Sequence, residues 1–334
     1  MHAMVLDKIS PIKDSPLQWR EVDDPHPGAG AGEVRVKVRC CAVCRTDLHI
    51  VEGDLEKPEL PRIPGHQVVG EVDQLGEGCD RLKQGQRIGI AWLRHTDGTC
   101  VHCRRGRENL CGASRYTGYD ADGGYAEYAV VPEDYAYELP GGMDDVAVSP
   151  LLCGGLIGYR ALNRAAVPEG GTLLLIGFGS SAHIVLPIAL HRGHRVLVMT
   201  RSENHQKLAR DMGAEWSGDG PRKLPRKSDS AILFAPSGKL VPVALEALDR
   251  GGTLSIAGIH LSPIPGLDYQ KHLFQERQVR SVTANTREDE RNLLAEAVEA
   301  GVRPTTTTYA LRDANRALQE MKDSAISGTG VLIP

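Results

Sequence analysis

The sequence has no large excess of charge of one sign and no run of basic residues that stands out. Its 39 lysines and arginines and its 43 aspartates and glutamates give a formal net charge of −4 at pH 7. Proteins that bind nucleic acids or anionic membranes electrostatically usually carry a strongly basic surface. The composition therefore argues against nucleic acid or an anionic membrane as the main partner.

The sequence also lacks a hydrophobic run long enough to cross a bilayer, which requires about 20 predominantly apolar residues. Glycine, serine, histidine and proline interrupt its most apolar stretch, Leu173–Leu190. The first residues, MHAMVLDKISPIKDS, contain no apolar core of a secretory signal peptide. We therefore expect no membrane association and a cytoplasmic, reducing location.

The length of 334 residues suggests about two domains at roughly 150 residues each. Hydrophobic residues make up 41% and charged residues 25%, as is ordinary for globular proteins. A chain of this size can bury its cores without disulfides. In a reducing location the 8 cysteines are then expected to be thiols or metal ligands.

The hydrophobic pattern changes near Cys153. Before it, Glu33–Arg39 alternates charged and apolar residues, which is typical of a strand with one solvated face. Similar strands are expected at Gln67–Val72 and Tyr125–Val131. After Cys153, short apolar runs alternate with helical stretches such as Glu203–Met212, which indicates a parallel sheet covered on both faces. Its strands are expected at Thr172–Ile176, Arg195–Met199, Ala231–Ala235, Thr253–Ala257 and Val279–Ala284, with a short extra strand near Ala214–Ser217.

The tail from about Thr286 follows the order helix, strand, helix, strand. It is too long for a terminal appendage, so we expect it to pack on the first domain. The predicted fold class is therefore α/β. We expect residues 1–154 and 286–334 to form a β-rich domain and residues 155–285 to form a domain built on a doubly wound parallel sheet.

A group of metal-ligand type occurs in one loop, as Asp97, Cys100, Cys103 and Cys111. A CxxC turn presents two sulfurs to one tetrahedral ion, and a third cysteine supplies another ligand. Asp97 stands three residues before Cys100, where a CxxCxxC series would place a further cysteine, and a carboxylate can bind zinc. We predict a structural zinc with Asp97 as fourth ligand. The alternative is a solvated Asp97 and a site that binds no metal.

A second, dispersed group consists of Cys44, His66 and Cys153. Two cysteines and one histidine form a minimal catalytic zinc site that leaves one position for water or substrate. Any one of these cysteines could instead be a buried packing residue. Together the two groups predict two zinc ions per chain. The remaining cysteines are interpreted as structural or inert: Cys40, Cys41 and Cys79.

A nucleotide site is predicted where an apolar strand leads into Gly177-x-Gly179-x-x-Ala182. Such a turn lets backbone N–H groups and a helix N-terminus bind a pyrophosphate. An NAD site usually has Asp or Glu about 20 residues later, to bind the ribose hydroxyls. Here Thr200 and Arg201 stand at that place, which favours NADP over NAD. The alternative is that Arg201 is only a solvated turn residue.

Together these residues make the sequence resemble the zinc-dependent medium-chain alcohol dehydrogenases, and more loosely their bacterial propanol-preferring members. The resemblance covers nearly the whole chain and implies a GroES-like catalytic domain joined to a Rossmann domain. It also implies a small-molecule alcohol or aldehyde as substrate and a homo-oligomer, either dimer or tetramer. The motifs that carry it are Cys44-Arg-Thr-Asp-Leu-His49, Gly65-His66, the cysteine loop ending in RENLC at Cys111, Cys153-Gly-Gly and the GxGxxA turn.

The resemblance implies a role for each residue that follows Cys44. Arg45 corresponds to a position that contacts the cofactor pyrophosphate. Thr46 corresponds to the hydroxyl that takes the substrate proton, and His49 to the histidine that passes that proton to solvent. Asp47 corresponds to a carboxylate that orients the zinc ligand His66.

The sequence departs from the family pattern at several positions. Gln67 replaces the usual Glu after His66, Asp97 replaces a cysteine, and Ile157 stands where Thr is common beside the nicotinamide. Trp92 is typical of small-alcohol enzymes, but Leu55 stands where some of them have a second Trp, which predicts a wider pocket.

Two other functions stay open from the sequence. One is a zinc-free quinone or enoyl reductase of the same superfamily, which should lack Cys44, His66 and Cys153. The other is a non-catalytic nucleotide-binding protein, against which the presence of both Thr46 and His49 argues because a fold alone needs no proton relay.

Overall fold

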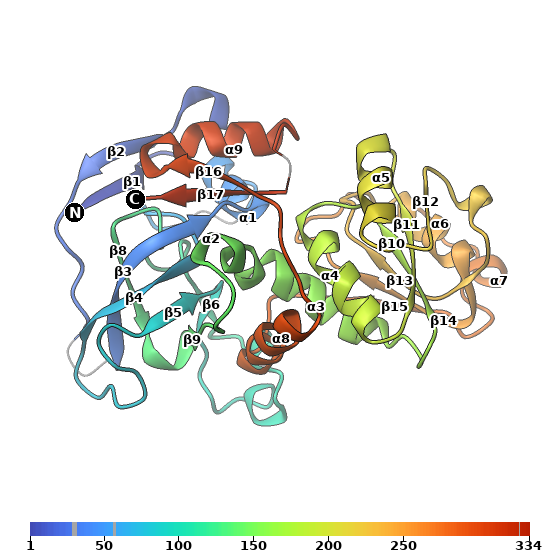
Figure 1. Ribbon diagram of the computed structural model, residues 1–334, viewed down its shortest axis with the longest axis horizontal. Helices are drawn as coiled ribbons and strands as arrows, with labels where there is room; N and C mark the ends of the chain where they lie inside the picture. The colour runs from blue at the N-terminus through green and yellow to red at the C-terminus, as the bar shows by residue number, and fades with distance from the viewer. Residues whose placement is uncertain (29–31, 56–57, 327) are drawn as a thin grey trace. The chain divides into compact units, whose positions relative to one another are not determined.

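The computed structural model describes residues 1–28, 32–55, 58–326 and 328–334, with only the backbone of Arg222. The chain divides into two compact units, which are considered separately (Figure 1). Unit 1 comprises Met1–Cys153, Ala284–Leu294 and Pro304–Pro334, and unit 2 comprises Gly154–Thr283 and Ala295–Arg303. Each helix in these described stretches is too short or too polar to cross a bilayer.

Unit 1 contains a seven-stranded sheet in the order β16-β17-β3-β4-β5-β9, with β8 also paired to β3. The last strand pairs antiparallel with an early one, with Leu332 opposite Cys41, and in Figure 1 the red β17 lies along the blue β3. The tail thus follows the predicted order helix, strand, helix, strand, and its last strand completes this sheet. The sheet strands are β3 (Glu33–Ala42), β4 (Gln67–Leu75), β5 (Arg87–Ile90), β8 (Tyr128–Pro132), β9 (Ala136–Glu138), β16 (Thr306–Ala310) and β17 (Thr329–Ile333).

Shorter elements complete unit 1. The pairs β1–β2 and β6–β7 form two small antiparallel sheets. Their strands are β1 (His2–Leu6), β2 (Leu17–Glu21), β6 (Leu93–His95) and β7 (Arg115–Tyr116). The helices are α1 (Arg45–Glu52), α2 (Asp145–Val148) and α9 (Ala314–Lys322), and the 3₁₀ turns are η1 (Ile12–Asp14), η2 (Cys103–Arg105), η3 (Glu108–Leu110), η4 (Glu133–Tyr135), η5 (Ser149–Leu152) and η7 (Leu311–Asp313).

The alternating pattern of β3 explains why this segment is a strand. Val34, Val36 and Val38 are buried, while the charged residues between them lie on the more accessible face. The strand continues to Ala42, beyond the predicted end at Arg39, because the residues after Arg39 are buried on both faces. It therefore ends close to Cys44.

The strand predicted at Tyr125–Val131 begins three residues later, as β8 at Tyr128. The preceding residues bond instead to the loop before His66. Gly123 N donates to Ile63 O at 2.8 Å, and Tyr125 N donates to Pro64 O at 2.9 Å. The apolar pattern correctly predicted that this segment is buried. Its first residues, however, form hydrogen bonds with a loop rather than with a strand, and nothing in the sequence pointed to that loop.

Unit 2 contains a six-stranded sheet in the order β12-β11-β10-β13-β14-β15, in which all pairs are parallel. The predicted parallel sheet with a short extra strand is confirmed. The strands are β10 (Thr172–Ile176), β11 (Arg195–Met199), β12 (Trp216–Gly218), β13 (Ser228–Leu233), β14 (Leu248–Ile256) and β15 (Gln278–Ser281). The helices are α3 (Gly154–Ala165), α4 (Ser180–His191), α5 (Glu203–Asp211), α6 (Leu240–Ala247) and α7 (Tyr269–His272), with a 3₁₀ turn η6 (Pro221–Lys223), and α8 (Arg287–Glu299) has residues in both units.

Candidate metal centres and active site

Helix α1 begins directly after Cys44, and its first turn holds several candidate residues. The Cys44 N–H donates to Asp47 Oδ2 at 2.8 Å, so the third residue of the helix caps its own N-terminus. A carboxylate at this position is favoured because it satisfies a free N–H and lies at the positive end of the helix dipole. The same hydrogen bond holds the backbone that carries the Cys44 sulfur.

Three distant segments bring Cys44, His66 and Cys153 together. Their ligand atoms all lie within 4.8 Å of one another, and the two Sγ atoms are 3.6 Å apart. The hydrogen bond between the sulfurs lowers the pKa of Cys44 and raises the pKa of Cys153. The thiolate form of Cys44 is therefore favoured, and the thiolate is the form of cysteine that binds metals.

The imidazole of His66 is oriented from behind by Asp47. His66 Nδ1 lies 2.8 Å from Asp47 Oδ1, and neither side chain is exposed. The other ring nitrogen, Nε2, is buried and has no hydrogen-bond partner among the described residues. Burial opposes the charged imidazolium, but Asp47 and Cys44 outweigh it and raise the pKa of His66 to about 10. A buried nitrogen that has no hydrogen-bond partner and lies among negatively charged groups is suited to bind a cation.

Thr46 and His49 lie on the same helix as Cys44. Thr46 is buried, and its Oγ1 is 3.7 Å from Cys44 Sγ, so the hydroxyl lies beside the candidate metal ligands. His49 Nδ1 lies 2.8 Å from Asp54 Oδ2. Sequence reasoning missed Asp54, although its position just after α1 could have suggested it. Arg45 is exposed at the start of the helix.

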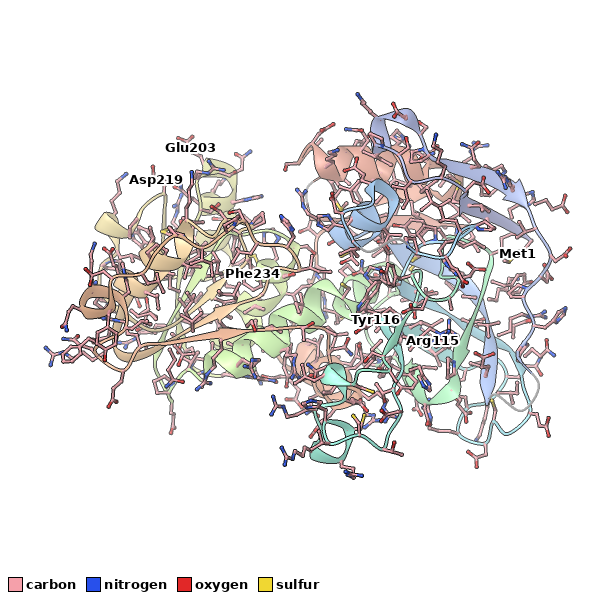
Figure 2. All side chains as sticks on the ribbon, turned by 180° about the vertical axis from the view of Figure 1, so that it is seen from behind. Met1, Arg115, Tyr116, Glu203, Asp219 and Phe234 are labelled. Atoms are coloured by element: carbon pink, nitrogen blue, oxygen red, sulfur yellow. The ribbon has the colours of Figure 1, made fainter. Side chains whose placement is uncertain are left out.

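Aromatic rings line the candidate site beside His66. Trp92 meets the His66 ring edge-on, with ring centroids 5.0 Å apart. Its indole stacks on Tyr116 at 4.8 Å and lies 6.0 Å from Tyr119. Figure 2 shows Tyr116 next to Arg115 on β7. Leu55 is half-buried against the same core.

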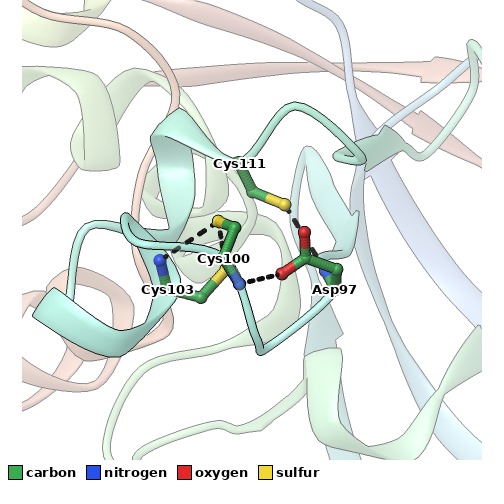
Figure 3. Close-up of side chains that lie close together, drawn as sticks. All are labelled: Asp97, Cys100, Cys103 and Cys111. Atoms are coloured by element: carbon green, nitrogen blue, oxygen red, sulfur yellow. Dashed lines mark hydrogen bonds between the residues drawn. The ribbon is translucent and has the colours of Figure 1, made fainter.

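The cysteine loop brings Asp97, Cys100, Cys103 and Cys111 into one cluster, shown in Figure 3. Their candidate ligand atoms also lie within 4.8 Å of one another. Asp97 Oδ1 accepts hydrogen bonds from the N–H groups of Thr99 and Cys100, at 2.7 and 2.8 Å. These bonds lower the pKa of Asp97, so its carboxylate stays ionised. Three sulfurs and one carboxylate form a ligand set that suits tetrahedral zinc.

A contact from a distant segment secures this loop within unit 1. Arg287, the first residue of α8, binds Glu108 in η3 through its Nη2 at 2.8 Å and through its backbone N–H at 2.7 Å. Its guanidinium also lies 4.8 Å from the ring centroid of Tyr135. Sequence reasoning missed this pair because the two residues are 179 positions apart.

The glycine turn in unit 2 joins β10 to α4. Gly177 has φ 90°, which L-residues rarely adopt, and a Cβ there would lie 3.1 Å from Ala235 N. Gly179 is the N-cap residue of α4, and a Cβ there would meet nothing within 4 Å. Ala182 is fully buried in the first turn. The turn therefore leaves the N-terminus of α4 open to a phosphate group, which fits a dinucleotide.

The residues after β11 have mixed roles. Thr200 is half-buried, and its backbone pairs with Gly218 at 2.8 Å. Arg201 is exposed, whereas the Ser202 hydroxyl is used as the N-cap of α5. Two carboxylates lie near the end of β11. Glu203 follows Ser202 in the sequence and Asp219 follows the neighbouring strand β12, and Figure 2 shows both at the same side of unit 2. Asp219 is paired with Lys223 at 2.9 Å.

Comparisons with known proteins agree with this geometry. Residues 30–141 match the family described as Alcohol dehydrogenase GroES-like domain. The chain is 50% identical to "Probable alcohol dehydrogenase AdhA" of Mycobacterium tuberculosis, covering 100% of this chain and 97% of that protein. It is 36% identical to an alcohol dehydrogenase of Geobacillus stearothermophilus, covering 95% of each. The solved alcohol dehydrogenase of Aeropyrum pernix is 26% identical, with a TM-score of 0.87 and 100% of both chains covered.

Proposed function

We propose which residues carry out the reaction of this chain, which belongs to the zinc-dependent medium-chain alcohol dehydrogenases and interconverts alcohols with aldehydes or ketones using a nicotinamide cofactor. Cys44, His66 and Cys153 bind the catalytic zinc. The observation that carries this assignment is the buried, unpartnered Nε2 of His66 in a cluster with two sulfurs. When bound, the zinc supplies a Lewis acid that favours ionisation of the substrate hydroxyl.

Thr46 and His49 are proposed to move the proton that the alcohol loses. Thr46 is buried beside Cys44, where Oγ1 can accept the proton of the alcohol while the hydroxyl passes its own proton on toward His49. His49, whose side chain is 16% exposed and whose Nδ1 is held by Asp54 Oδ2, is proposed to pass the proton to water. Once the cofactor is bound, the nicotinamide accepts the hydride, and the protein orients it.

We propose a second, structural zinc held by Asp97, Cys100, Cys103 and Cys111. Its support is the convergence of four ligand atoms within 4.8 Å and the ionised state of Asp97. Since the cluster is partly exposed and the loop lacks long regular elements, metal binding would hold its shape.

We propose NADP as the preferred cofactor. Thr200 and Arg201 supply a hydroxyl and a cation at the end of β11, where an NAD site would supply a carboxylate. Arg45 is proposed to bind the pyrophosphate because it is an exposed cation at the start of α1. Within unit 2, the Gly177–Gly179 turn and Ala182 are proposed to bind the dinucleotide at the N-terminus of α4.

The substrate is proposed to lie against Trp92, with Leu55 leaving space for a larger alcohol. Trp92 supports this because its ring contacts the metal ligand His66 directly, at 5.0 Å between centroids. Tyr116 stacks on the indole with an interplanar angle of 15°, so two nearly parallel rings form this wall.

We also propose that the chain forms a homo-oligomer, with a dimer or tetramer as the expected state. Among the described strands, the terminal strand β15 pairs with β14 alone, and it is mostly exposed. Exposed apolar side chains gather on the elements that follow β14, including Ile259, Tyr269, Phe274 and Val279. A strand at the edge of a sheet has one row of unpaired backbone groups, which favours pairing with a second chain. A cytoplasmic location is proposed because none of the 8 cysteines, all of which are described, forms a disulfide.

One steady-state experiment tests the core of this proposal. The kcat/KM for NADH and NADPH is measured over aldehydes of two to eight carbons, with enzyme untreated or incubated with a zinc chelator. We expect aldehyde reduction that the chelator abolishes and added zinc restores. Reduction of quinones or enones that survives chelation would instead support a zinc-free reductase.

A further inference from the structure

Asp54 lies just beyond the end of α1, and its carboxylate contacts the ring of His49. His49 Nδ1 and Asp54 Oδ2 are 2.8 Å apart, the usual length of a hydrogen bond to an ionised carboxylate. The side chain of His49 is 16% exposed, and that of Asp54 is 54% exposed. The histidine end of the pair is thus largely shielded from water, whereas the carboxylate end is solvated.

The turn that ends α1 brings this carboxylate back to the histidine. Gly53 has φ 80°, which L-residues rarely adopt, and a Cβ there would lie 2.6 Å from Ile9 Cγ2. The N–H groups of Gly53 and Asp54 both donate to His49 O, at 3.0 and 2.9 Å. Asp54 is therefore bonded to His49 through its backbone as well as through its side chain. The backbone of the turn, and not only a mobile side chain, sets the place of the carboxylate.

The hydrogen bond determines which nitrogen of His49 carries the proton. An ionised carboxylate accepts hydrogen bonds and donates none, so Nδ1 is the donor. In the neutral ring the lone pair then lies on Nε2, which is the atom that can take up a further proton. Thr46 stands three residues before His49 on α1, so the two side chains project from the same side of the helix.

We propose that Asp54 is a positioning residue for proton release, which holds His49 in the Nδ1–H tautomer so that Nε2 receives the proton coming from Thr46. This inference rests on the proposed roles of Thr46 and His49. The arriving proton forms an N–H bond at Nε2 and makes the ring a cation, which then loses one proton to water. Because Nδ1–H is bonded to Asp54, the ring returns to the tautomer that accepts the next proton.

The tautomer of His49 gives the direct test. In the full chain labelled with ¹⁵N-histidine, long-range ¹H–¹⁵N couplings show which ring nitrogen carries the proton, at alkaline pH where histidines are neutral. The His49 signals are those that disappear in His49→Ala. We expect Nδ1–H in the unmutated protein and a larger share of Nε2–H in Asp54→Ala, because the acceptor at Nδ1 is lost. Nε2–H in the unmutated protein, or an unchanged tautomer in Asp54→Ala, would overturn the inference.

The single-turnover rate of 1-butanol oxidation measures the consequence for the reaction, since it excludes product release, which often limits turnover. Proton-transfer groups contribute about 10²–10⁴-fold, and Asp54 acts on one of them indirectly, so we expect Asp54→Ala to lower the rate about three- to tenfold. The loss should not exceed that of His49→Ala, and KM should change little. Asp54→Glu keeps a carboxylate and should retain most of the rate.

Glu299→Gln is the matched control. It removes a carboxylate that lies 3.8 Å from another exposed histidine, His191, and it should match the unmutated protein in rate. The control therefore shows whether loss of any surface carboxylate beside a histidine slows the reaction.

A double-mutant cycle separates this role from a general effect on the turn after α1. If Asp54 acts through His49, the rate of the double variant should equal that of His49→Ala alone. A further loss in the double variant, or a normal rate in Asp54→Ala while His49→Ala is slow, would overturn the inference. A normal rate in His49→Ala would instead refute the proposed proton path, which is a different outcome.

Discussion

Asp47 and His66 form a fully buried pair, with Oδ1 and Nδ1 2.8 Å apart and neither side chain accessible to solvent. The same carboxylate accepts the Cys44 N–H through its other oxygen. One acidic side chain therefore orients two of the three proposed catalytic zinc ligands. Because the pair is sealed from water, its charge is weakly screened and acts strongly on the metal site.

The first prediction concerns this pair. Asp47→Asn keeps the shape of the side chain but removes its charge, so it should reduce zinc affinity and activity by about 10–100-fold. Zinc content after dialysis against a chelator measures the effect. Asp73→Asn is the control, since Asp73 pairs with Arg35 away from the metal cluster. Unchanged zinc content in Asp47→Asn would show that the carboxylate does not support the ligand.

The second prediction concerns the cysteine loop. Elemental analysis should find about two zinc ions per chain if both clusters bind metal as four-coordinate sites. Asp97→Ala should lower the count by about one and reduce the melting temperature, since a structural zinc contributes to folding stability. The catalytic ion should remain. Cys79→Ala removes a thiol outside both clusters and should leave the count unchanged, whereas full zinc content in Asp97→Ala would exclude Asp97 as a ligand.

The third prediction concerns the proton path. Thr46→Ala should lower kcat far more than His49→Ala, because Thr46 would touch the reacting oxygen whereas water can partly replace His49. Groups that transfer protons typically contribute about 10²–10⁴-fold to the rate. Thr46→Ser, which keeps the hydroxyl, should retain most of the activity. Near-normal turnover by Thr46→Ala would remove this residue from the mechanism.

The fourth prediction concerns cofactor choice. Arg201→Ala should weaken NADPH binding alone, because a charge-assisted contact worth about 1.5–3 kcal/mol is lost, which is roughly one to two decades in KM. Thr200→Asp should weaken NADPH binding and improve NADH binding, since a carboxylate repels the phosphate. Values of kcat/KM for both cofactors at one aldehyde concentration show which cofactor the protein prefers. A clear preference of the unmutated protein for NADH would refute the NADP assignment but not the dehydrogenase activity.

The fifth prediction concerns the pH dependence of stability. Burial, with the charge of His205 as a smaller cause, lowers the pKa of His183 to about 4. In the unfolded chain a histidine has a pKa of about 6.5, so the unfolded state binds more protons between these values. The free energy of unfolding should therefore fall as the pH drops from about 6.5 to about 4. His183→Leu should flatten this part of a melting-temperature profile, whereas the exposed His95→Leu should not.

Local spacing carried most of what could be predicted from the sequence. The CxxC turn, the Asp97 position and the glycine turn each involve residues a few positions apart, so short-range geometry brings their atoms together. The parallel strands of unit 2 could also be predicted from the sequence, because strands such as β10 are buried on both faces and therefore appear as continuous apolar runs.

The sequence by itself thus determined the types of chemistry available: two metal-ligand sets, a phosphate-binding turn and a hydroxyl next to a cysteine. Only the tertiary structure decided those contacts between distant segments that neither the motifs nor the family resemblance indicated. The pairing of Tyr125 with the loop before His66, the contact of Arg287 with Glu108 and the burial of Asp47 all join segments far apart in the chain. Such contacts depend on strand register and on the close packing of unlike segments, and neither is encoded in the pattern of any single segment.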